Sequence, residues 1–318
     1  MNPTVTVIAL SYNHVAFLSE AINSLLDQTY PSIEIIAIDD ASTDASVGIL
    51  EAFAAKGVLT LISNKENRGN CASFNQALKR ASGKYIIDFS TDDVLLPEMV
   101  EKMVEKFESV GEDYGLVFGD CMYIDEAGTF IKTHYKRDKE GIIAEEVPEG
   151  AVYADAVKRY FIPAPAVMLR KSMLKELGGY DEALSYEDFD LWVRAARNYK
   201  FCFLNRLVIK KRLHPRALSV NFYNRKNKLQ ESTFRVCEKI LWLNKNKEED
   251  KALTKRVKYE MRQAYFTGST ILVLKYIRLL KHLEPLKWQY VFFGILSKAG
   301  ISGYFPFSVY LRIRKNIK

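Results

Sequence analysis

The first 110 residues alternate between two hydrophobic patterns. Short apolar runs rich in Val and Ile predict β-strands, and stretches with apolar residues three and four positions apart predict α-helices. The expected strands are residues 4–10, 33–39, 58–63 and 85–90. The expected helices are residues 14–28, 45–55, 70–81 and 97–108. This alternation is typical of an α/β fold, in which helices flank both faces of a mainly parallel sheet.

The pattern changes after the fourth helix. A polar excursion occupies residues 125–165, with a helix near 151–160 and a return to the sheet at PAPAVMLR. A short helix then ends at Gly178-Gly179, and two strand-like runs, FCFLN and RLVIKKRL, follow. The last part predicts helices at residues 223–243, 247–265, 269–283 and 286–299. We therefore expect an α/β domain over residues 1–220 and a helical C-terminal region over residues 221–318.

Composition supports a globular chain whose two parts meet different partners. The 318 residues are 48% hydrophobic, which is enough for a large core. Residues 1–219 contain 25 Lys and Arg against 32 Asp and Glu, a net charge of −7. Residues 220–318 contain 21 against 7, a net charge of +14.

Two further observations concern the compartment. The four cysteines have no C-x-x-C pair or metal-ligand spacing, so a reducing compartment is the default expectation. The N-terminus runs directly into a strand-like segment, and the chain contains no apolar run of about 18 residues. We infer neither secretion nor a membrane-spanning helix.

Groups suited to a polar ligand follow three of the four expected strands. These groups are Ser11-Tyr12-Asn13, the acidic stretch 39–44 and Ser90-Thr91-Asp92-Asp93. Ligands of such sheets bind beyond the carboxyl ends of the strands. Two acidic pairs at one edge would repel each other, and a divalent cation such as Mg²⁺ or Mn²⁺ would offset that repulsion. The alternative is that Asp93 or Ser42 only caps the next helix.

The absence of two phosphate-binding motifs limits the kinds of phosphate ligand that the chain could bind. Neither G-x-G-x-x-G nor the P-loop sequence G-x-x-x-x-G-K-[ST] occurs, which argues against a dinucleotide cofactor and a P-loop. An acidic edge with a metal ion suits a nucleoside diphosphate that is held through its cation.

Two later segments could bring further groups to this edge. Glu187-Asp188 open a helix, where they either cap it or serve as a general base toward an acceptor hydroxyl. His214 lies in a basic loop after the two strand-like runs, so it is either a surface residue or a ligand returned to the site.

These segments together resemble family 2 glycosyltransferases, which are inverting enzymes of the GT-A fold. The resemblance begins with VTVIALSYNHVAFLSEAINSLLDQTYPSIEIIAIDDASTDAS and continues, in the family's order, through ENRGNCASFNQALKRASGKYII, STDD, GGYDEALSYEDFDLWVR and RLHPRALS. It covers about residues 4–220. It implies nucleotide-sugar binding by about residues 1–125 and acceptor binding and catalysis by about residues 126–220.

The resemblance also implies roles for individual residues. Asp188 would be the catalytic base. The metal ligands would be Asp92, Asp93 and His214, with Mn²⁺ or Mg²⁺ as cofactor; Asp92 and Asp93 would also hold the ribose, and His214 could instead bind the diphosphate. Tyr12 and Asp40 would contact the nucleobase. The full expected donor-binding set is Leu10, Tyr12, Asn13, Asp40, Arg68, Asn75 and Asp92. Glu187 and Trp192 are expected on the acceptor side.

The chain departs from the family pattern at three positions. Ser90 stands where many members have the first Asp of the D-x-D motif, so ribose contact and metal ligation can be distributed differently. Leu10 and Phe74 replace a frequent Pro and a frequent Arg. Arg68 remains a candidate for the donor diphosphate, against the alternative of a solvated loop residue.

The expected reaction moves a sugar, with inversion, from a nucleotide diphosphate sugar such as a UDP-hexose or UDP-N-acetylhexosamine to an acceptor hydroxyl. The acceptor would be a saccharide or lipid-linked saccharide in bacterial surface-polysaccharide synthesis. The enzyme would be cytoplasmic, peripheral on the inner face of the cell membrane. The alternative is a catalytically inert nucleotide-sugar-binding protein or a basic protein that binds membranes or nucleic acid.

The basic C-terminal region suggests the membrane contact. Its expected helices combine Lys and Arg with aromatic residues, which is typical of peripheral enzymes on anionic bilayers. The alternatives for residues 266–318 are packing on the catalytic domain and an oligomer interface. The region lacks a recognisable nucleic-acid-binding motif, so we do not expect nucleic acid as a partner.

Overall fold

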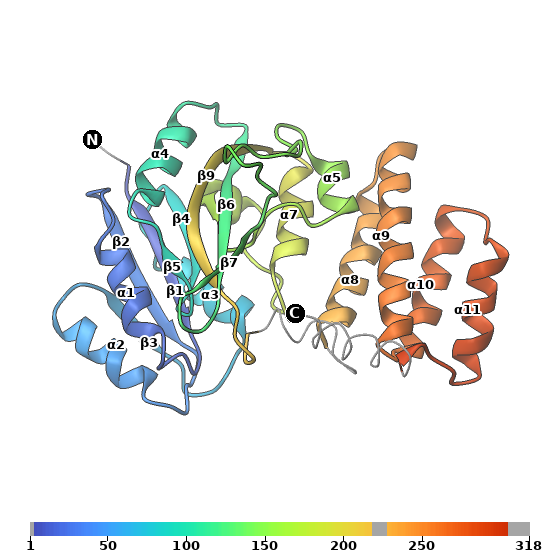
Figure 1. The fold of residues 1–318 in the computed structure, drawn as a ribbon, viewed down its shortest axis with the longest axis horizontal. Helices are drawn as coiled ribbons and strands as arrows, with labels where there is room; N and C mark the ends of the chain where they lie inside the picture. Colours follow the sequence, from blue (N-terminus) through green and yellow to red (C-terminus); the bar gives the residue numbers. More distant parts are fainter. Residues whose placement is uncertain (1–2, 218–227, 305–318) are drawn as a thin grey trace. The chain divides into compact units, whose positions relative to one another are not determined.

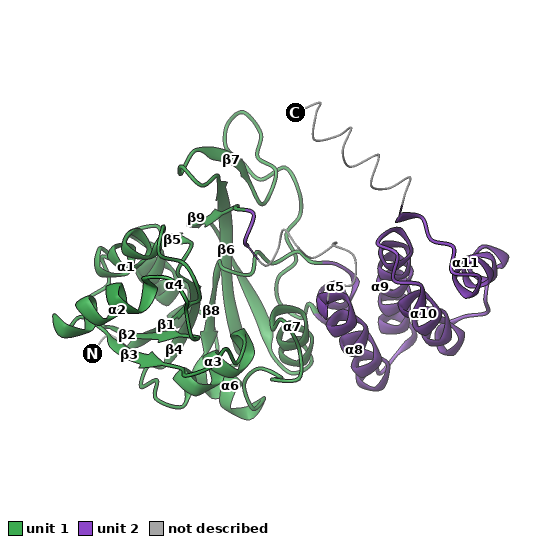
Figure 2. Cartoon of the chain, turned by 90° about the horizontal axis from the view of Figure 1, so that it is seen from below, with its two compact units in different colours: residues 1–152, 160–214 green, residues 153–159, 215–318 purple. Residues whose placement is uncertain are grey.

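The computed structural model describes residues 3–217 and 228–304. The chain forms two compact units (Figure 2), residues 1–152 with 160–214 and residues 153–159 with 215–318. The first unit contains the β-sheet. The second unit is helical.

The sheet of the first unit is mixed, with a parallel N-terminal part (Figure 1). Its strands lie in the order β3 (Thr60–Ser63), β2 (Ile33–Asp39), β1 (Val5–Ser11), β4 (Tyr85–Ser90), β8 (Val167–Arg170), β6 (Tyr114–Ile124), β9 (Lys200–Arg212) and β5 (Val94–Leu95). β7 (Phe130–Thr133) pairs with β6 outside this path. β8 joins antiparallel to both β4 and β6, whereas β6 and β9 are parallel.

The strand order reverses at β1. β1 pairs in parallel with β2 on one side and with β4 on the other. The register places Ser11 beside Asp39 and Leu10 beside Ser90, so the carboxyl ends of the three strands lie side by side. Such a switch point is where open α/β sheets bind their ligands.

Helices cover both faces of this sheet. α1 (Leu18–Leu26) and α4 (Met99–Glu108) lie on one face, and α3 (Asn70–Leu78) and α6 (Lys171–Glu176) on the other (Figure 2). α2 (Ser46–Ala55) packs near β2 and β3, and α7 (Asp188–Ala196) precedes β9.

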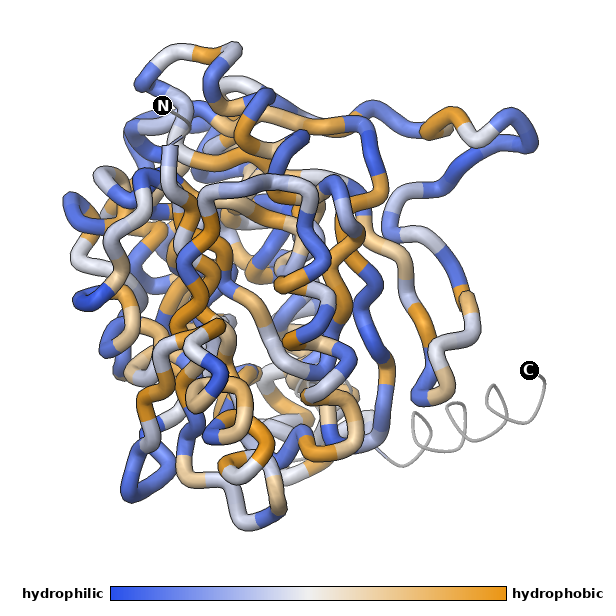
Figure 3. Tube along the Cα trace, turned by 90° about the vertical axis from the view of Figure 1, so that its left-hand side faces the viewer, coloured by the Kyte–Doolittle hydropathy of each residue, from blue (hydrophilic) through white to orange (hydrophobic). Residues whose placement is uncertain are grey.

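Alternating strand residues build the core. Val5, Val7 and Ala9 of β1 point to the face that α1 and α4 cover, and all three are fully buried. They pack in one cluster with residues that include Ile22 of α1 and Met103 of α4. Apolar colour accordingly follows the strands through the interior in Figure 3. The expected α/β class with a mainly parallel sheet is confirmed.

Two elements differ most from the ranges that the hydrophobic pattern predicts. The helix expected to begin at residue 14 begins at Leu18, because Asn13 has a left-handed φ of 56° and the His14 N–H donates to Ser46 Oγ. The two strand-like runs after residue 200 form one 13-residue strand, β9. It stays paired with β6 through register shifts near Asp120, so the polar residues Asn205 and Arg206, where the two runs meet, do not interrupt it.

The second unit is a helical array. It contains α5 (Tyr153–Lys158), α8 (Lys228–Leu243), α9 (Lys247–Phe266), α10 (Thr270–Leu283) and α11 (Trp288–Lys298). The first residues of the helix expected at 223–243 lie outside the described residues. None of the described helices combines the length and the apolar run needed to cross a bilayer.

Hydrogen bonds fix two points of this array. The side chain of Asn246 caps α9, accepting from the N–H groups of Glu248 and Glu249. Arg256, which is almost fully buried, donates to the Val157 carbonyl of α5 and pairs with Glu260 one turn along α9. The charge of Arg256 is thus compensated inside the unit.

Candidate active site

The loop after β1 is fastened to the loop after β2. The Asn13 N–H donates to Ser42 Oγ at 2.9 Å, and Asn13 Oδ1 accepts from the Thr43 N–H at 2.8 Å. Asn is among the few residues that adopt the left-handed conformation readily, which suits it to this turn. The result is that the following residue, His14, is held at the carboxyl edge of the sheet.

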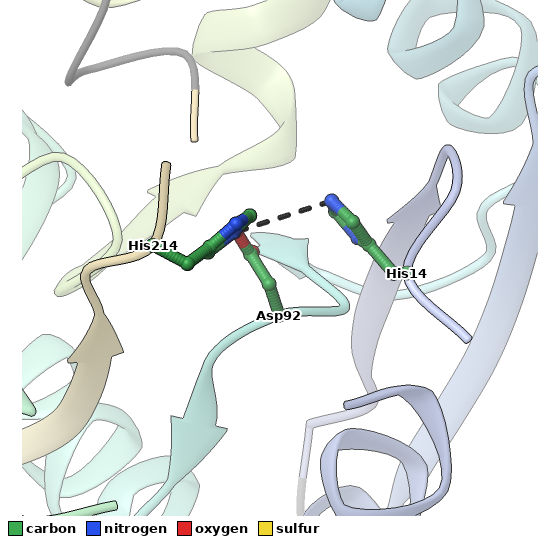
Figure 4. Close-up of side chains that lie close together, drawn as sticks. All are labelled: His14, Asp92 and His214. Atoms are coloured by element: carbon green, nitrogen blue, oxygen red, sulfur yellow. Dashed lines mark hydrogen bonds and ion pairs between the residues drawn. The ribbon is translucent and has the colours of Figure 1, made fainter. Parts of the chain in front are cut away.

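His14, Asp92 and His214 converge from three separate loops (Figure 4). They follow β1, β4 and β9, and one potential ligand atom of each lies within 4.8 Å of the others. His214 Nε2 hydrogen-bonds with Asp92 Oδ2 at 2.9 Å, whereas His14 Nε2 is 3.9 Å from the same oxygen. His214 and Asp92 are buried, and His14 is half-buried.

The hydrogen bonds define the tautomer of His14. Its Nδ1 lies 2.9 Å from Thr91 Oγ1, and that hydroxyl already donates to the Leu10 carbonyl. Nδ1 must therefore carry the proton, which leaves the lone pair of Nε2 directed toward Asp92 in the neutral ring. Burial lowers the pKa of His14, and this effect outweighs the charge of Asp92, which would raise it. The lowered pKa favours the neutral ring.

Asp92 is held as a carboxylate. Burial alone would raise its pKa, but the hydrogen bond from His214, the nearby His14 and the hydroxyl of Ser90 lower it to about 2. A carboxylate oxygen and an imidazole lone pair thus face each other at 3.9 Å. Two electron-pair donors at this separation, with a second imidazole beside them, fit a divalent cation.

Asp93 has different surroundings from its neighbour. Its Oδ1 accepts the Arg212 N–H at 2.8 Å, and it is not one of the three grouped ligand residues. Burial, together with the charge of Asp92, raises the pKa of Asp93 well above the usual value. The side chain of Arg212 also donates to the Asp92 carbonyl and pairs with Glu20, so Arg212 fastens the end of β9 to this turn.

Asp40 organises the loop between β3 and α3. Its Oδ1 accepts from the Asn64 amide, the Arg68 N–H and the Ser73 hydroxyl, each at 2.9 Å. Its Oδ2 accepts the Gly69 N–H at 2.8 Å. A carboxylate offers about four acceptor positions on its two oxygens. Asp40 is buried, and among the described residues Oδ2 accepts one hydrogen bond whereas Oδ1 accepts three.

The other expected donor residues lie at or beside this edge. Tyr12 is 44% exposed directly after β1. Leu10 is buried in β1 beside Ser90. Arg68 is exposed, and its guanidinium donates to Gln76.

Asn75 is occupied by the loop after α6. Its amide donates to the Tyr180 carbonyl at 2.8 Å and to Glu182, and its oxygen accepts the Tyr180 N–H. Gly179 passes so close that an added Cβ would collide with Asn75 Oδ1, and its φ is 75°. The amide of Asn75 therefore positions Tyr180, whose ring contacts that of Phe74 with centroids 4.1 Å apart and the planes tilted by 30°.

Asp188 lies at the start of α7 in a group of three carboxyls with Asp88 and Glu187. Asp88 comes from the middle of β4 and accepts a hydrogen bond from the Tyr180 hydroxyl at 2.8 Å. The Cys71 sulfur lies 3.9 Å from Glu187 and 3.6 Å from the Leu184 carbonyl. Three carboxyl groups, each able to carry a negative charge, thus share one environment that is shielded from solvent.

Burial raises the pKa of each member of this group. Burial raises the pKa of Asp88 to about 7, with a further contribution from Asp188. Burial, then the charges of Asp188 and Asp88, raise the pKa of Glu187 well above its usual value. Burial raises the pKa of Asp188 to about 6, and the positive charge of Lys211 opposes this rise. At neutral pH Asp188 is mostly ionised and able to accept a proton.

Lys211 of β9 acts on both acidic groups. Its charge lowers the pKa of Asp188 and, at the other group, the pKa of Asp93.

Trp192, expected on the acceptor side, lies one turn into α7. It is 5% exposed and packs in the interior of the first unit.

Three residues of the site were not singled out by the sequence analysis: His14, Asp88 and Tyr180. An isolated Asp in the apolar strand YIIDFS was the signal for Asp88, since an unpaired charge is rarely placed in a strand that is buried on both faces. Neither His14 nor Tyr180 carried such a signal, because their partners Thr91 and Asp88 are distant in sequence.

Comparisons with known proteins identify the family of the chain. The model of the glycosyl transferase family 2 matches residues 6–178, more than half of the chain. The chain belongs to this family and is a glycosyltransferase.

Similar sequences carry the same class of name. An uncharacterized glycosyltransferase of Methanocaldococcus jannaschii is 29% identical over 252 residues, 76% of this chain and 81% of that protein. EpsE of Bacillus subtilis, also named as a glycosyltransferase, is 34% identical over 197 residues, 60% of this chain and 66% of EpsE.

Solved structures share the fold. TarS of S. aureus, in complex with UDP-GlcNAc, has a TM-score of 0.67 at 19% identity, covering 88% of this chain and 80% of the TarS chain. A mannosyltransferase from Pyrobaculum calidifontis, in complex with GDP-Man and Mn²⁺, has a TM-score of 0.61 at 16% identity, covering 98% of this chain and 83% of that chain. At these identities the likeness establishes the GT-A fold.

Proposed function

We propose that the chain transfers a sugar, with inversion, from a UDP-hexose or UDP-N-acetylhexosamine to the hydroxyl of a saccharide or lipid-linked saccharide. The observation that carries the proposal is the presence in one unit of both required groups. A cation-binding set comprises His14, Asp92 and His214. Asp188, with a pKa of about 6, is a base of suitable strength.

The cation-binding set favours Mn²⁺ over Mg²⁺. Mg²⁺ prefers oxygen ligands, whereas imidazole nitrogen suits softer divalent ions. When bound, the ion supplies positive charge for the diphosphate of the donor. Asp92 contributes the anionic ligand, and His14 contributes Nε2 because its Nδ1 proton is held by Thr91. The Asp93 carboxyl, bonded to the Arg212 N–H, supports the turn that carries Asp92.

The remaining donor contacts surround this set. Tyr12 and Asp40 are proposed to meet the nucleobase, Tyr12 through its exposed ring and Asp40 through Oδ2. Arg68 is proposed to meet the diphosphate from the exposed loop that Asp40 holds. Leu10, Asn13 and Asn75 are proposed to shape the donor site through the backbone they position.

The proposed chemistry is a single displacement. Asp188 accepts the proton of the acceptor hydroxyl while that oxygen forms a bond to the anomeric carbon. The bond from the anomeric carbon to the diphosphate breaks, and its electron pair leaves with the nucleoside diphosphate. Attack from the opposite face inverts the configuration. Glu187 and Trp192 are proposed to shape the acceptor side, and the acceptor is proposed to lie at the inner face of the cell membrane, in surface-polysaccharide synthesis.

A donor panel tests the proposal. UDP- and GDP-sugars are incubated with the full chain and Mn²⁺, and the released nucleoside diphosphate is measured with and without candidate acceptors. We expect release from a UDP-hexose or UDP-N-acetylhexosamine that requires Mn²⁺ and is lost in Asp188→Asn. Tight donor binding without release, in wild type and variant alike, would instead identify a catalytically inert nucleotide-sugar-binding protein.

A further inference from the structure

Helix α11 of the second unit has apolar residues on two opposite faces. Its inner face packs within the unit: Tyr290, Gly294 and Ser297 are buried. The ring of Phe293 contacts Tyr265 of α9 with centroids 4.8 Å apart, and a Cβ at Gly294 would lie 3.2 Å from Ile277 of α10. This face gives α11 its position.

The outer face is apolar and uncovered by the described residues. Trp288 is 80% exposed, Val291 45%, Phe292 52% and Ile295 60%. Their spacing of three, four and seven residues places them on one stripe of the helix, which we call the α11 stripe. A helix that is apolar on both sides is normally covered on both sides, and a contiguous exposed patch marks an interaction surface.

Charge identifies what covers the stripe. Residues 266–304 carry five basic side chains against one acidic side chain, Glu284. The basic side chains are Lys275, Arg278, Lys281, Lys287 and Lys298. Glu284 is already paired with Lys258 at 2.6 Å. Lys287 precedes the stripe and Lys298 follows it, and both side chains are exposed. Lys275 is also paired, with Glu231 at 2.6 Å, so the charges that flank the stripe are those of Lys287 and Lys298. An anionic partner satisfies these two charges, whereas the same stripe of a second copy would bring lysines together.

We propose that the α11 stripe inserts into the surface of an anionic lipid bilayer, with Trp288 and Phe292 at the boundary between headgroups and acyl chains. The 11 residues of α11 span about 16 Å, and the hydrocarbon core is about 30 Å thick, so the helix lies along the surface. Trp is suited to this boundary because its ring is apolar and its N–H is polar. The inference deepens the proposed function by naming the surface that would bring the enzyme to a lipid-linked acceptor.

Vesicle binding by the full chain tests this inference without requiring turnover. Binding is measured with vesicles of phosphatidylcholine and with vesicles that also contain phosphatidylglycerol. We expect binding to the anionic vesicles that weakens with salt, and a loss of about tenfold or more in Trp288→Glu/Phe292→Glu. The matched control is Trp242→Glu, because Trp242 of α8 is an exposed Trp outside the stripe, 87% exposed, and its replacement should leave binding unchanged.

Two further readouts keep the test decisive. Lys287→Gln/Lys298→Gln, which leaves the apolar residues intact, should also weaken binding to the anionic vesicles. Equal loss in the Trp242 control, no loss in the stripe variant, or a stripe variant that converts a dimer to a monomer without affecting vesicle binding would overturn the inference. Donor hydrolysis measured in parallel separates the two proposals: retained hydrolysis with lost binding supports the α11 stripe, and retained binding with no hydrolysis in wild type contradicts only the proposed function.

Discussion

Asp92 and Asp188 are the same residue type in two neighbouring environments, and their pKa values move in opposite directions. Burial raises the pKa of both. At Asp92 the hydrogen bond from His214, the nearby His14 ring and the hydrogen bond from Ser90 reverse the effect and lower its pKa to about 2. At Asp188 only Lys211 opposes burial, and the pKa is about 6. The partners thus decide which carboxylate is suited to hold a cation and which to accept a proton.

The largest expected effect is on the base alone. In Asp188→Asn the amide cannot accept the acceptor's proton, so kcat should fall by about 10² to 10⁴. The dissociation constant for UDP in the presence of Mn²⁺, measured by calorimetry, should stay close to the wild-type value. A variant that turns over at the wild-type rate would remove Asp188 from the mechanism.

The next effect concerns the cation and uses two adjacent residues. Asp92→Asn removes the charge next to both imidazoles, and Mn²⁺ affinity should fall by more than about tenfold. Asp93→Asn is the matched control, since an amide oxygen can still accept the Arg212 N–H. Mn²⁺ titration followed by electron paramagnetic resonance measures both. Equal losses in the two variants would make Asp93 a ligand as well.

Two adjacent glycines, Gly178 and Gly179, allow the contact between residue 179 and Asn75 to be tested through the free energy of unfolding. Gly179→Ala combines a left-handed φ with a collision against Asn75 Oδ1, whereas Gly178→Ala has a similar φ of 74° and open space. We expect Gly178→Ala to lose about 1 kcal/mol of unfolding free energy and Gly179→Ala about 2 to 3 kcal/mol. Chemical denaturation measures this difference.

Gly179→Ala should also displace Tyr180 from Asp88, which lowers kcat while leaving Mn²⁺ affinity unchanged. If Mn²⁺ affinity fell in parallel with kcat, the environments of Asp92 and Asp188 would not be independent of each other.

The smallest effect is a shift in pH dependence. Because Asp188 must be ionised to accept a proton, kcat/KM should fall as the pH drops through about 6. Lys211→Met removes the charge that lowers the pKa of Asp188, so this decline should move to higher pH by up to about one unit. Lys211→Arg should restore the wild-type profile. A decline that does not move in Lys211→Met would mean that another group controls it.

The sequence was sufficient for the features that depend on local pattern. Alternating strand and helix periods predicted the parallel part of the sheet, and the carboxyl ends of β1 and β4 carry polar residues as that topology requires. His214, which follows the strand-like runs, was placed as a possible ligand, and the structure brings it to 2.9 Å from Asp92.

Other features depend on tertiary contacts that no local pattern encodes. The orientation of His14 depends on its hydrogen bond with Thr91, 77 residues away. Residues 14–17 have a helical hydrophobic pattern but form a loop, because α1 begins only at Leu18. Asp92 and Asp93 are adjacent, yet the turn directs one toward His214 and the other toward the backbone of Arg212. The grouping of Asp88 with Glu187 and Asp188 likewise requires α7 to dock beside β4.

The most direct test of the division between ion-binding and base carboxylates is the effect of Mn²⁺ on UDP affinity, measured by calorimetry in wild type, Asp92→Asn and Asp188→Asn. We predict that Mn²⁺ strengthens UDP binding in wild type and in Asp188→Asn but not in Asp92→Asn. Loss of the Mn²⁺ effect in Asp188→Asn, or its retention in Asp92→Asn, would contradict the account.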